Sequence, residues 1–183
     1  MMKLEMQERR VEKAGLQENG DTEPPVRFSG RFALFLASGL GAGYIPWAPG
    51  TAGTLLVGVP LGFALTRTGL AWAPPVAAAF LFLVGVWAAR ACERIYGRKD
   101  PQMVVLDEVV GFLIALPGGA PRWGELLAAF ILFRAFDIFK PWPAGLIDRR
   151  LRGGTGVMLD DVVAGLYARL VLEVALTVLP ATT

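Results

Sequence analysis

The chain has 183 residues and a formal net charge of +2; 54% of its residues are hydrophobic and only 19% are charged. In an average soluble domain, roughly a quarter of the residues are charged. The small net charge gives no reason to expect a nucleic-acid partner. The absence of histidine excludes a Ser-His-Asp triad, a phosphohistidine intermediate and histidine-ligated zinc, and the single cysteine, Cys92, excludes an internal disulfide.

The first 31 residues differ from the rest because charged side chains occur throughout them. They contain no apolar segment of the kind that a signal peptide requires. We expect residues 1–31 to form a mobile or interfacial N-terminal tail. Residues 32–183 are expected to form a single membrane-embedded helical domain.

Two runs without any charged residue follow, from Phe32 to Thr66 and from Leu70 to Ala89. The second run is long enough to cross a bilayer as a helix, which takes about 20 residues. The first cannot be one regular helix, because the glycines and prolines of residues 39–53 force turns. We expect a helix to begin at Thr51, which would be its N-cap, and to continue through residues 55–65.

Three further helices are expected at residues 107–116, 123–140 and 161–179. The first would be only about 15 Å long and too short to span alone, so it begins earlier, near Met103, or sits shallow within the bundle. The sequence therefore predicts an all-α integral membrane helix bundle. About five helices would span or partly span the membrane, together with the glycine/proline-rich broken segment. A globular all-α protein is the alternative, because alanine and glycine also enrich tight soluble bundles.

When consecutive expected helices cross the membrane in alternating directions, the basic residues gather on one side of it. The opposite side receives only Arg67 and Arg122. The positive-inside bias places the basic side in the cytoplasm. The basic side collects Arg90, Arg94, Arg98, Lys99, Lys140, Arg149, Arg150 and Arg152, together with the basic tail.

A short acidic phrase occurs twice on this same side, as VVLDEVVG at residues 104–111 and VMLDDVVAG at residues 157–165. Each phrase places two adjacent carboxylates ahead of an apolar stretch: Asp107 with Glu108, and Asp160 with Asp161. Because a hydrophobic chain must compensate each buried carboxylate, the four predict a hard, oxygen-ligated cation such as Mg²⁺. Asp107 and Asp160 could instead cap helices, which would leave Glu108 and Asp161 unexplained.

The segment AAFILFRAFDIFK places Arg134, Asp137 and Lys140 at positions i, i+3 and i+6, near one helix face. We interpret Asp137 as a general base or extra metal ligand, and Arg134 and Lys140 as neutralising the charge on phosphate oxygens. A plain intrahelical ion pair between Arg134 and Asp137 is the structural alternative.

Two other segments carry candidate substrate contacts. Gly50, Thr51 and Gly53 lie in a glycine-rich turn before a helix, which suits phosphate binding but also a break between packed helices. Asp148 is either a helix-end charge or a metal or water ligand. Arg149 is a candidate substrate contact, and with Arg150 and Arg152 it could equally anchor the chain to anionic lipid headgroups.

In this order, the motifs GxGxxPxxPGTxGTL, LDEVVG, FRxFDIxKPWP, IDR and GGTGVMLDDVVAG resemble those of the phosphatidylglycerophosphatase A family. The resemblance covers residues 39–165. It implies an integral membrane phosphatase that uses Mg²⁺ to convert phosphatidylglycerophosphate to phosphatidylglycerol and phosphate. It also implies a multi-pass protein of the bacterial inner membrane with a cytoplasm-facing active site. Functional roles carry over to Asp107, Glu108, Arg134, Asp137, Lys140, Asp148, Asp160 and Asp161.

The sequence-based hypothesis is therefore metal-assisted hydrolysis of a lipid phosphate. Asp107, Glu108, Asp160 and Asp161 would hold Mg²⁺, with Asp161 also counted among the catalytic residues, and water attack is preferred to an aspartyl-phosphate. One alternative is a soluble or peripheral member of the same family with a different phosphorylated substrate. Another is an ion-coupled membrane transporter. The sequence assigns no oligomeric state.

Overall fold

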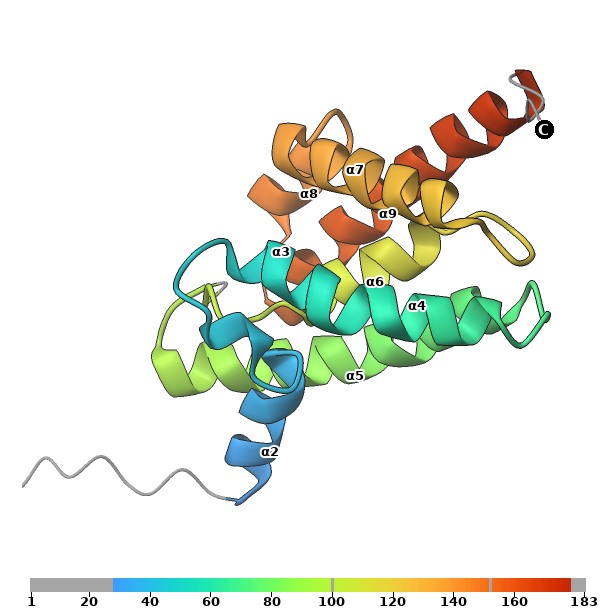
Figure 1. Cartoon of the computed structure of the whole chain (residues 1–183). Coiled ribbons are helices and arrows are strands. Elements are labelled where there is room, and N and C mark those ends of the chain that lie inside the picture. The colour runs from blue at the N-terminus through green and yellow to red at the C-terminus, as the bar shows by residue number, and fades with distance from the viewer. Residues whose placement is uncertain (1–27, 100, 152, 179–183) are drawn as a thin grey trace, which may run out of the picture.

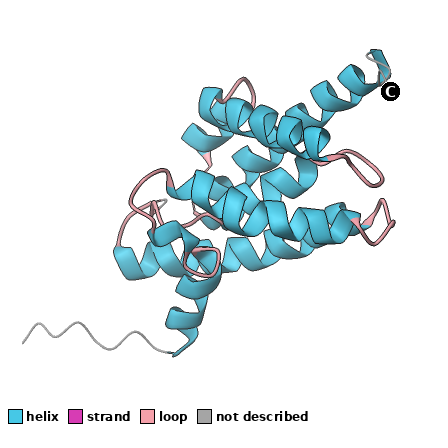
Figure 2. Ribbon diagram, viewed as in Figure 1, coloured by secondary structure: helices cyan, strands magenta, loops and turns pink. Residues whose placement is uncertain are grey.

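The computed structural model describes residues 28–99, 101–151 and 153–178, and all regular elements in these ranges are helical (Figures 1 and 2). The predicted all-α class is confirmed for this part of the chain. In chain order the elements are α2 (Phe28–Ala37), the 3₁₀ turn η1 (Ala42–Tyr44), α3 (Pro49–Gly53), the π-helical η2 (Thr54–Gly58), α4 (Val59–Thr66), α5 (Ala73–Tyr96), α6 (Leu106–Ala115), α7 (Trp123–Phe139), α8 (Ala144–Arg150) and α9 (Gly154–Val178).

The short helix α6 lies at the centre of the bundle, where it packs against η2, α5, α7 and α9. Val109, Val110, Phe112 and Leu113 of α6 are fully buried. With ten residues, α6 is about 15 Å long, too short to cross a bilayer. The apolar side chains of α6 are therefore enclosed by the neighbouring helices of the bundle.

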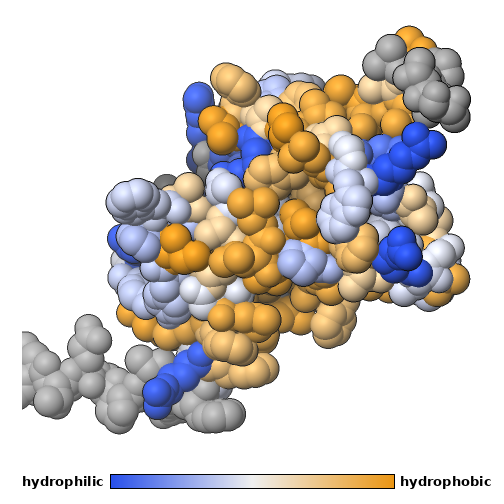
Figure 3. Space-filling view, in the orientation of Figure 1, coloured by the Kyte–Doolittle hydropathy of each residue, from blue (hydrophilic) through white to orange (hydrophobic). Residues whose placement is uncertain are grey.

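In the described part of the chain, two helices are long and apolar enough to cross a membrane: the continuous helix Pro49–Thr66, formed by α3, η2 and α4, and α5. They run side by side and are joined by the turn at residues 67–72 (Figure 1). Only 33% and 28% of their most apolar windows are buried, whereas the core helix of a soluble protein is mostly buried. Figure 3 shows hydrophobic side chains across the face that carries these helices, with hydrophilic side chains mainly toward its margins.

The start of the first of these helices corrects the prediction at Thr51. The helix begins at Pro49 with Ala48 as its N-cap, so Thr51 lies within the helix and is not the cap. Proline suits the first helical position because it lacks the N–H group that would have no partner there. The preceding segment is broken as predicted, with left-handed backbone at Gly39, Leu40 and Gly41.

The start of α9 also differs from the sequence-based expectation. The helix begins at Gly154, so the expected start at Asp161 is wrong, and both acidic residues lie well inside the helix. A Cβ on Gly154 would overlap the carbonyl oxygen of Val86, so this glycine lets α9 lie directly on the backbone of α5. That packing outweighs the low helix propensity of the glycines.

The first described helix overlaps the range expected for the N-terminal tail. Helix α2 begins at Phe28, inside the expected tail, and residues 1–27 of that tail fall outside the described residues. Figure 1 shows α2 crossing α5 at a steep angle. Ala33 and Ala37 of α2 are buried in a small cluster with Ala88, Ala89 and Cys92 of α5.

The set of basic residues expected at the end of the bundle that carries the turn at residues 67–72 needs one correction. The sequence assigned Arg67 and Arg122 to that end, but Arg169 of α9 also lies there, next to the loop that follows α6. Its guanidinium is 3.6 Å from Glu173, which accepts a hydrogen bond from the backbone N–H of Gly118 at 3.2 Å. Arg169 therefore adds a third basic residue to that end, paired with a carboxylate.

The contact between α6 and α9 gives a stability prediction. A Cβ on Gly165 would overlap the carbonyl oxygen of Gly111, and backbone cannot yield as a flexible side chain can. We expect Gly165→Ala to lower the free energy of unfolding by about 1–3 kcal/mol, measured as a lower melting temperature in detergent. Gly124→Ala on α7, where the new Cβ meets nothing within 4 Å, should be neutral or stabilising, and equal losses in both variants would contradict the packing argument.

Candidate active site

A cleft of about 310 Å³ lies at the end of the bundle where α3, α6 and α9 begin and α7 ends. Acidic side chains dominate its lining. The residues are Pro46, Pro49, Gln102, Val104, Asp107, Glu108, Asp137, Lys140, Val157, Asp160 and Asp161.

A backbone contact between α6 and α9 aligns the two acidic segments. Gly111 and Gly165 meet where the helices cross, and a Cβ on Gly111 would lie 2.7 Å from the carbonyl oxygen of Asp161. Asp107 and Asp161 each lie four residues before one of these glycines. Residues four apart occupy the same helix face, so both carboxylates project toward the cleft one turn from the crossing.

The two acidic phrases are not equivalent in space, because the second has an additional residue, Ala164, before its glycine. Asp161, and not Asp160, therefore occupies the position that corresponds to Asp107. Carboxylate oxygens of Asp107, Glu108 and Asp161 lie within 4.8 Å of one another. Asp160 instead forms an ion pair with Lys140, whose Nζ donates to Asp160 Oδ2 at 2.5 Å. The predicted set of four carboxylates is divided into three that converge and one that holds Lys140.

The alternative in which the aspartates act as helix caps is wrong at both positions. Helix α6 begins at Leu106 with Val105 as its N-cap, so Asp107 lies in the first turn. Its Oδ1 accepts a hydrogen bond from the backbone N–H of Glu108 at 3.1 Å. Asp160 lies well after the start of α9 at Gly154.

The basic residues of α7 occupy different places. Arg134 Nη1 donates to Asp137 Oδ2 at 2.5 Å and lies 4.0 Å from Glu108 Oε1. Arg134 does not line the cleft, so it stands behind the two carboxylates and orients them. Lys140 does line the cleft. The ion pair between Arg134 and Asp137, which was the structural alternative, is thus present and lies at the site.

The cleft carries more acidic than basic groups. Five carboxylates line it, and Lys140 and Arg134 are the basic side chains paired with them. Asp161 is buried and faces the charges of Asp137, Glu108 and Asp160. Close like charges in apolar surroundings are costly unless a counter-charge is bound.

One oxygen atom of Glu108 illustrates the excess of carboxylates over basic groups in the cleft. Its Oε2 is buried and has no hydrogen-bond partner among the described residues. Burial raises the pKa of Glu108; a hydrogen bond with Asp107 and the charge of Arg134 act in the opposite direction, but the net shift stays upward. A divalent cation would supply the missing partner. The donor set consists of carboxylate oxygens, which fits a hard ion such as Mg²⁺.

The predicted phosphate-binding turn takes a different part in the site. Gly50 is buried, and a Cβ there would overlap Glu108 Oε1. Gly53 packs on Val105, whose Cγ2 would lie 2.6 Å from an added Cβ. Neither glycine nor Thr51 lines the cleft, which the turn reaches through its prolines. Gly50 and Gly53 therefore let α3 pack closely on α6 and its carboxylates.

The remaining predicted residues lie on α8. Arg149 is exposed and does not line the cleft. The side chain of Asp148 and all of Arg152 fall outside the described residues. Substrate contacts from Asp148 and Arg149 stay predictions.

Sequence reasoning missed five lining residues: Pro46, Pro49, Gln102, Val104 and Val157. The repeat itself contained a signal for two of them, because Val104 and Val157 each lie three residues before the first aspartate of their phrase. Pro46 and Pro49 belong to the predicted broken segment. Gln102 lies on the loop before α6, and no sequence pattern marks it.

The chain is similar in sequence to a family of known proteins. The family model described as phosphatidylglycerophosphatase A matches residues 35–176. A Bacteroides thetaiotaomicron protein, provisionally named a phosphatidylinositol-3-phosphatase, is 40% identical over 78% of this chain and 92% of its own length. Two proteins named phosphatidylglycerophosphatase A are also similar: one from Haemophilus influenzae (40% identical, 75% of this chain, 84% of its own) and one from Escherichia coli (36%, 73% and 77%). No solved structure gives a significant match.

The position of Gly50 leads to a prediction about the site. Gly50→Ala should displace the Glu108 carboxylate and reduce divalent-cation affinity about tenfold, measured by titration with Mn²⁺ and electron paramagnetic resonance. Gly124→Ala is the matched control because it adds the same methyl group where there is open space. Unchanged Mn²⁺ affinity in Gly50→Ala would show that Glu108 does not help to hold the ion.

The excess of carboxylates in the cleft leads to a second prediction, which concerns thermal stability. In EDTA, Asp161→Asn should be at least as stable as the wild type, because it removes one of several like charges that face one another. Mg²⁺ at one hundred times its Kd should stabilise the wild type by about 2.7 kcal/mol and Asp161→Asn by much less. Glu173→Gln, far from the cleft, should keep the full Mg²⁺ effect. An equal Mg²⁺ effect in all three proteins would remove Asp161 from the cation site.

Proposed function

We propose that this chain, which belongs to the phosphatidylglycerophosphatase A family, hydrolyses the terminal phosphate of phosphatidylglycerophosphate to give phosphatidylglycerol and phosphate. Family membership makes it a phosphoric monoester hydrolase. The observation that carries the proposal is the convergence of Asp107, Glu108 and Asp161 beside Lys140 in a cleft of an otherwise apolar bundle. Such a cleft offers ligands for a hard cation and a counter-charge for a phosphate oxygen.

We assign the metal to Asp107, Glu108 and Asp161. When bound there, Mg²⁺ supplies Lewis-acid polarisation of the phosphate and lowers the pKa of a water molecule. Asp160 takes a different role from the one that the sequence suggested, because it holds the Lys140 ammonium at the cleft.

The remaining residues act on the proton and on the phosphate charge. Asp137 lines the cleft and accepts the proton of the attacking water, while Arg134 fixes its carboxylate from behind. The new bond joins the water oxygen to phosphorus, and the bond from phosphorus to the glycerol oxygen breaks, with a proton going to that oxygen. Lys140 offsets the charge that develops on the phosphate oxygens.

We further propose that the protein is a multi-pass protein of the bacterial inner membrane and that the cleft faces the cytoplasm. The two apolar helices, with most of their surface unburied, support insertion. Arg94 and Arg98 lie at the C-terminal end of α5 and Arg149 at that of α8, and both helix ends are at the cleft end of the bundle (Figure 1), which supports a cytoplasmic position. The acidic residues that line the cleft all lie at this one end, which disfavours the ion-coupled transporter, since a transport path must reach both faces.

A second substrate has one specific observation in its favour. The Bacteroides thetaiotaomicron relative, provisionally named for phosphatidylinositol 3-phosphate, is as similar to this chain as the Haemophilus influenzae phosphatidylglycerophosphatase A. The same cleft chemistry serves both substrates, because each is a phosphomonoester on a lipid headgroup. The choice between them depends on residues that contact the headgroup alcohol.

The test is phosphate release by the purified full chain in vesicles that contain either lipid. We expect release from phosphatidylglycerophosphate with Mg²⁺ and none with EDTA. Asp161→Asn should reduce kcat/KM at least about a hundredfold, while Glu173→Gln should leave it near the wild-type value. Faster turnover of phosphatidylinositol 3-phosphate would change the assigned substrate, and no release from either lipid would refute the proposed function.

A further inference from the structure

Three aromatic side chains beside the cleft are the most exposed large hydrophobic residues in the described part of the chain. Trp47 is 84% exposed, Phe139 is 82% exposed and Trp142 is 79% exposed. Each lies within two residues of a residue that lines the cleft: Trp47 follows Pro46, and Phe139 and Trp142 flank Lys140. The most exposed apolar side chains therefore belong to the same segments as residues that line the polar cleft.

The backbone that presents Phe139 and Trp142 is held firmly. The Trp142 carbonyl accepts a hydrogen bond from the Tyr167 hydroxyl at 2.8 Å, and the Tyr167 ring packs against Phe136 at a centroid distance of 5.6 Å. Lys140, which ends α7, has a left-handed backbone with φ of 43°. This bend directs the chain away from the helix while the Lys140 ammonium stays at Asp160.

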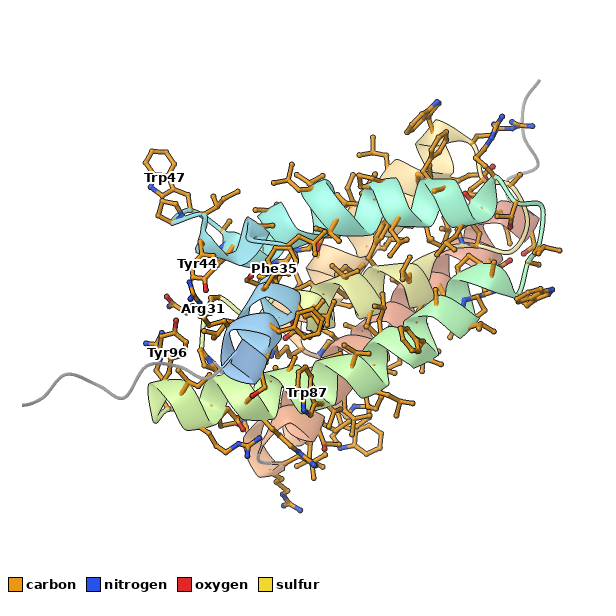
Figure 4. The ribbon with its side chains drawn as sticks, turned by 90° about the horizontal axis from the view of Figure 1, so that it is seen from below. Arg31, Phe35, Tyr44, Trp47, Trp87 and Tyr96 are labelled. Atoms are coloured by element: carbon orange, nitrogen blue, oxygen red, sulfur yellow. The ribbon has the colours of Figure 1, made fainter. Side chains whose placement is uncertain are left out.

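Trp47 is presented by a second segment of similar construction. Pro46 and Pro49 restrict the backbone on either side of it, and Ala48 has a left-handed φ of 50°. Figure 4 shows Trp47 at the tip of this segment, pointing away from the bundle and lying beyond Tyr44 and Tyr96. Its indole has no aromatic neighbour among the ring contacts of the described residues.

These two kinds of surface match the two parts of a phospholipid monoester. The cleft offers a basic side chain and cation ligands for the phosphate, while the surrounding aromatic side chains offer apolar surface. Exposed aromatics next to a polar site indicate a binding surface, and Trp in particular favours the level of lipid headgroups, where one side of the ring is apolar and the other wet. A water-soluble phosphate ester would use the cleft and leave the aromatics without a partner.

We propose that Trp47, Phe139 and Trp142 form a substrate rim that binds the glycerol backbone and upper acyl chains of the phospholipid whose phosphate enters the cleft. The rim makes the enzyme selective for lipid-borne phosphate over soluble phosphate esters. The proposal rests on the proposed function, because it takes a lipid phosphomonoester as the substrate of the cleft.

The test compares a lipid and a soluble substrate in the same proteoliposomes. Phosphate release is measured for long-chain phosphatidylglycerophosphate in the vesicles and for its dibutyroyl analogue dissolved in the surrounding water. In the double variant Trp47→Ala/Trp142→Ala, we expect the ratio of kcat/KM for the lipid to kcat/KM for the soluble ester to fall about tenfold. The loss should appear mainly in KM for the lipid.

Trp72→Ala is the matched control, because Trp72 is 59% exposed at the opposite end of the bundle, at the start of α5. Its ratio should equal that of the wild type. An unchanged ratio in the rim variant, an equal loss on both substrates, or the same fall in Trp72→Ala would each overturn the rim. A wild type inactive on both esters would instead refute the proposed function, and the rim with it.

Discussion

The backbones of α6 and α9 touch at Gly111 and Gly165, and the positions of the cleft carboxylates follow from that contact. Both helices begin at the same end of the bundle, and an aspartate lies one turn before each glycine. Larger side chains at the crossing would push the helices apart and separate the acidic oxygens that now lie within 4.8 Å. The apolar side chains on either side of Gly111 in α6 are buried. Like charges are therefore brought together by packing, and a bound cation would offset their repulsion.

Sequence reasoning located the helices well where apolar runs were long. The range for α7 agreed with the structure within one residue, and α5 was found but continued to Tyr96, past the apolar run. The errors occurred at starts that contain glycine or proline, at Thr51 and Asp161. Local propensity treats such residues as breaks, whereas Pro49 begins a helix and Gly154 permits a close backbone contact that only the folded bundle makes.

The acidic members of the site could be predicted because the repeated phrase marked them. Their division into roles could not, since one additional residue, Ala164, changes which aspartate of α9 faces α6. Spacing along α7 placed Arg134 and Lys140 on one face and gave them the same role. The left-handed backbone at Lys140 separates them, so that one lies behind the carboxylates and the other at the cleft. Such a bend at a lysine has no signature in the sequence.

The direct contact of two helical backbones also constrains how this enzyme family can diversify. The acidic residues of α6 and α9 have little freedom to shift, whereas connecting segments such as those around Trp47 and Trp142 in general vary more than the helices that they join. Relatives named for different phospholipids, phosphatidylglycerophosphate and phosphatidylinositol 3-phosphate, retain 36–40% identity with this chain. A fixed acidic centre bordered by more variable segments would let contacts with the headgroup alcohol change while the acids that serve the phosphate are retained.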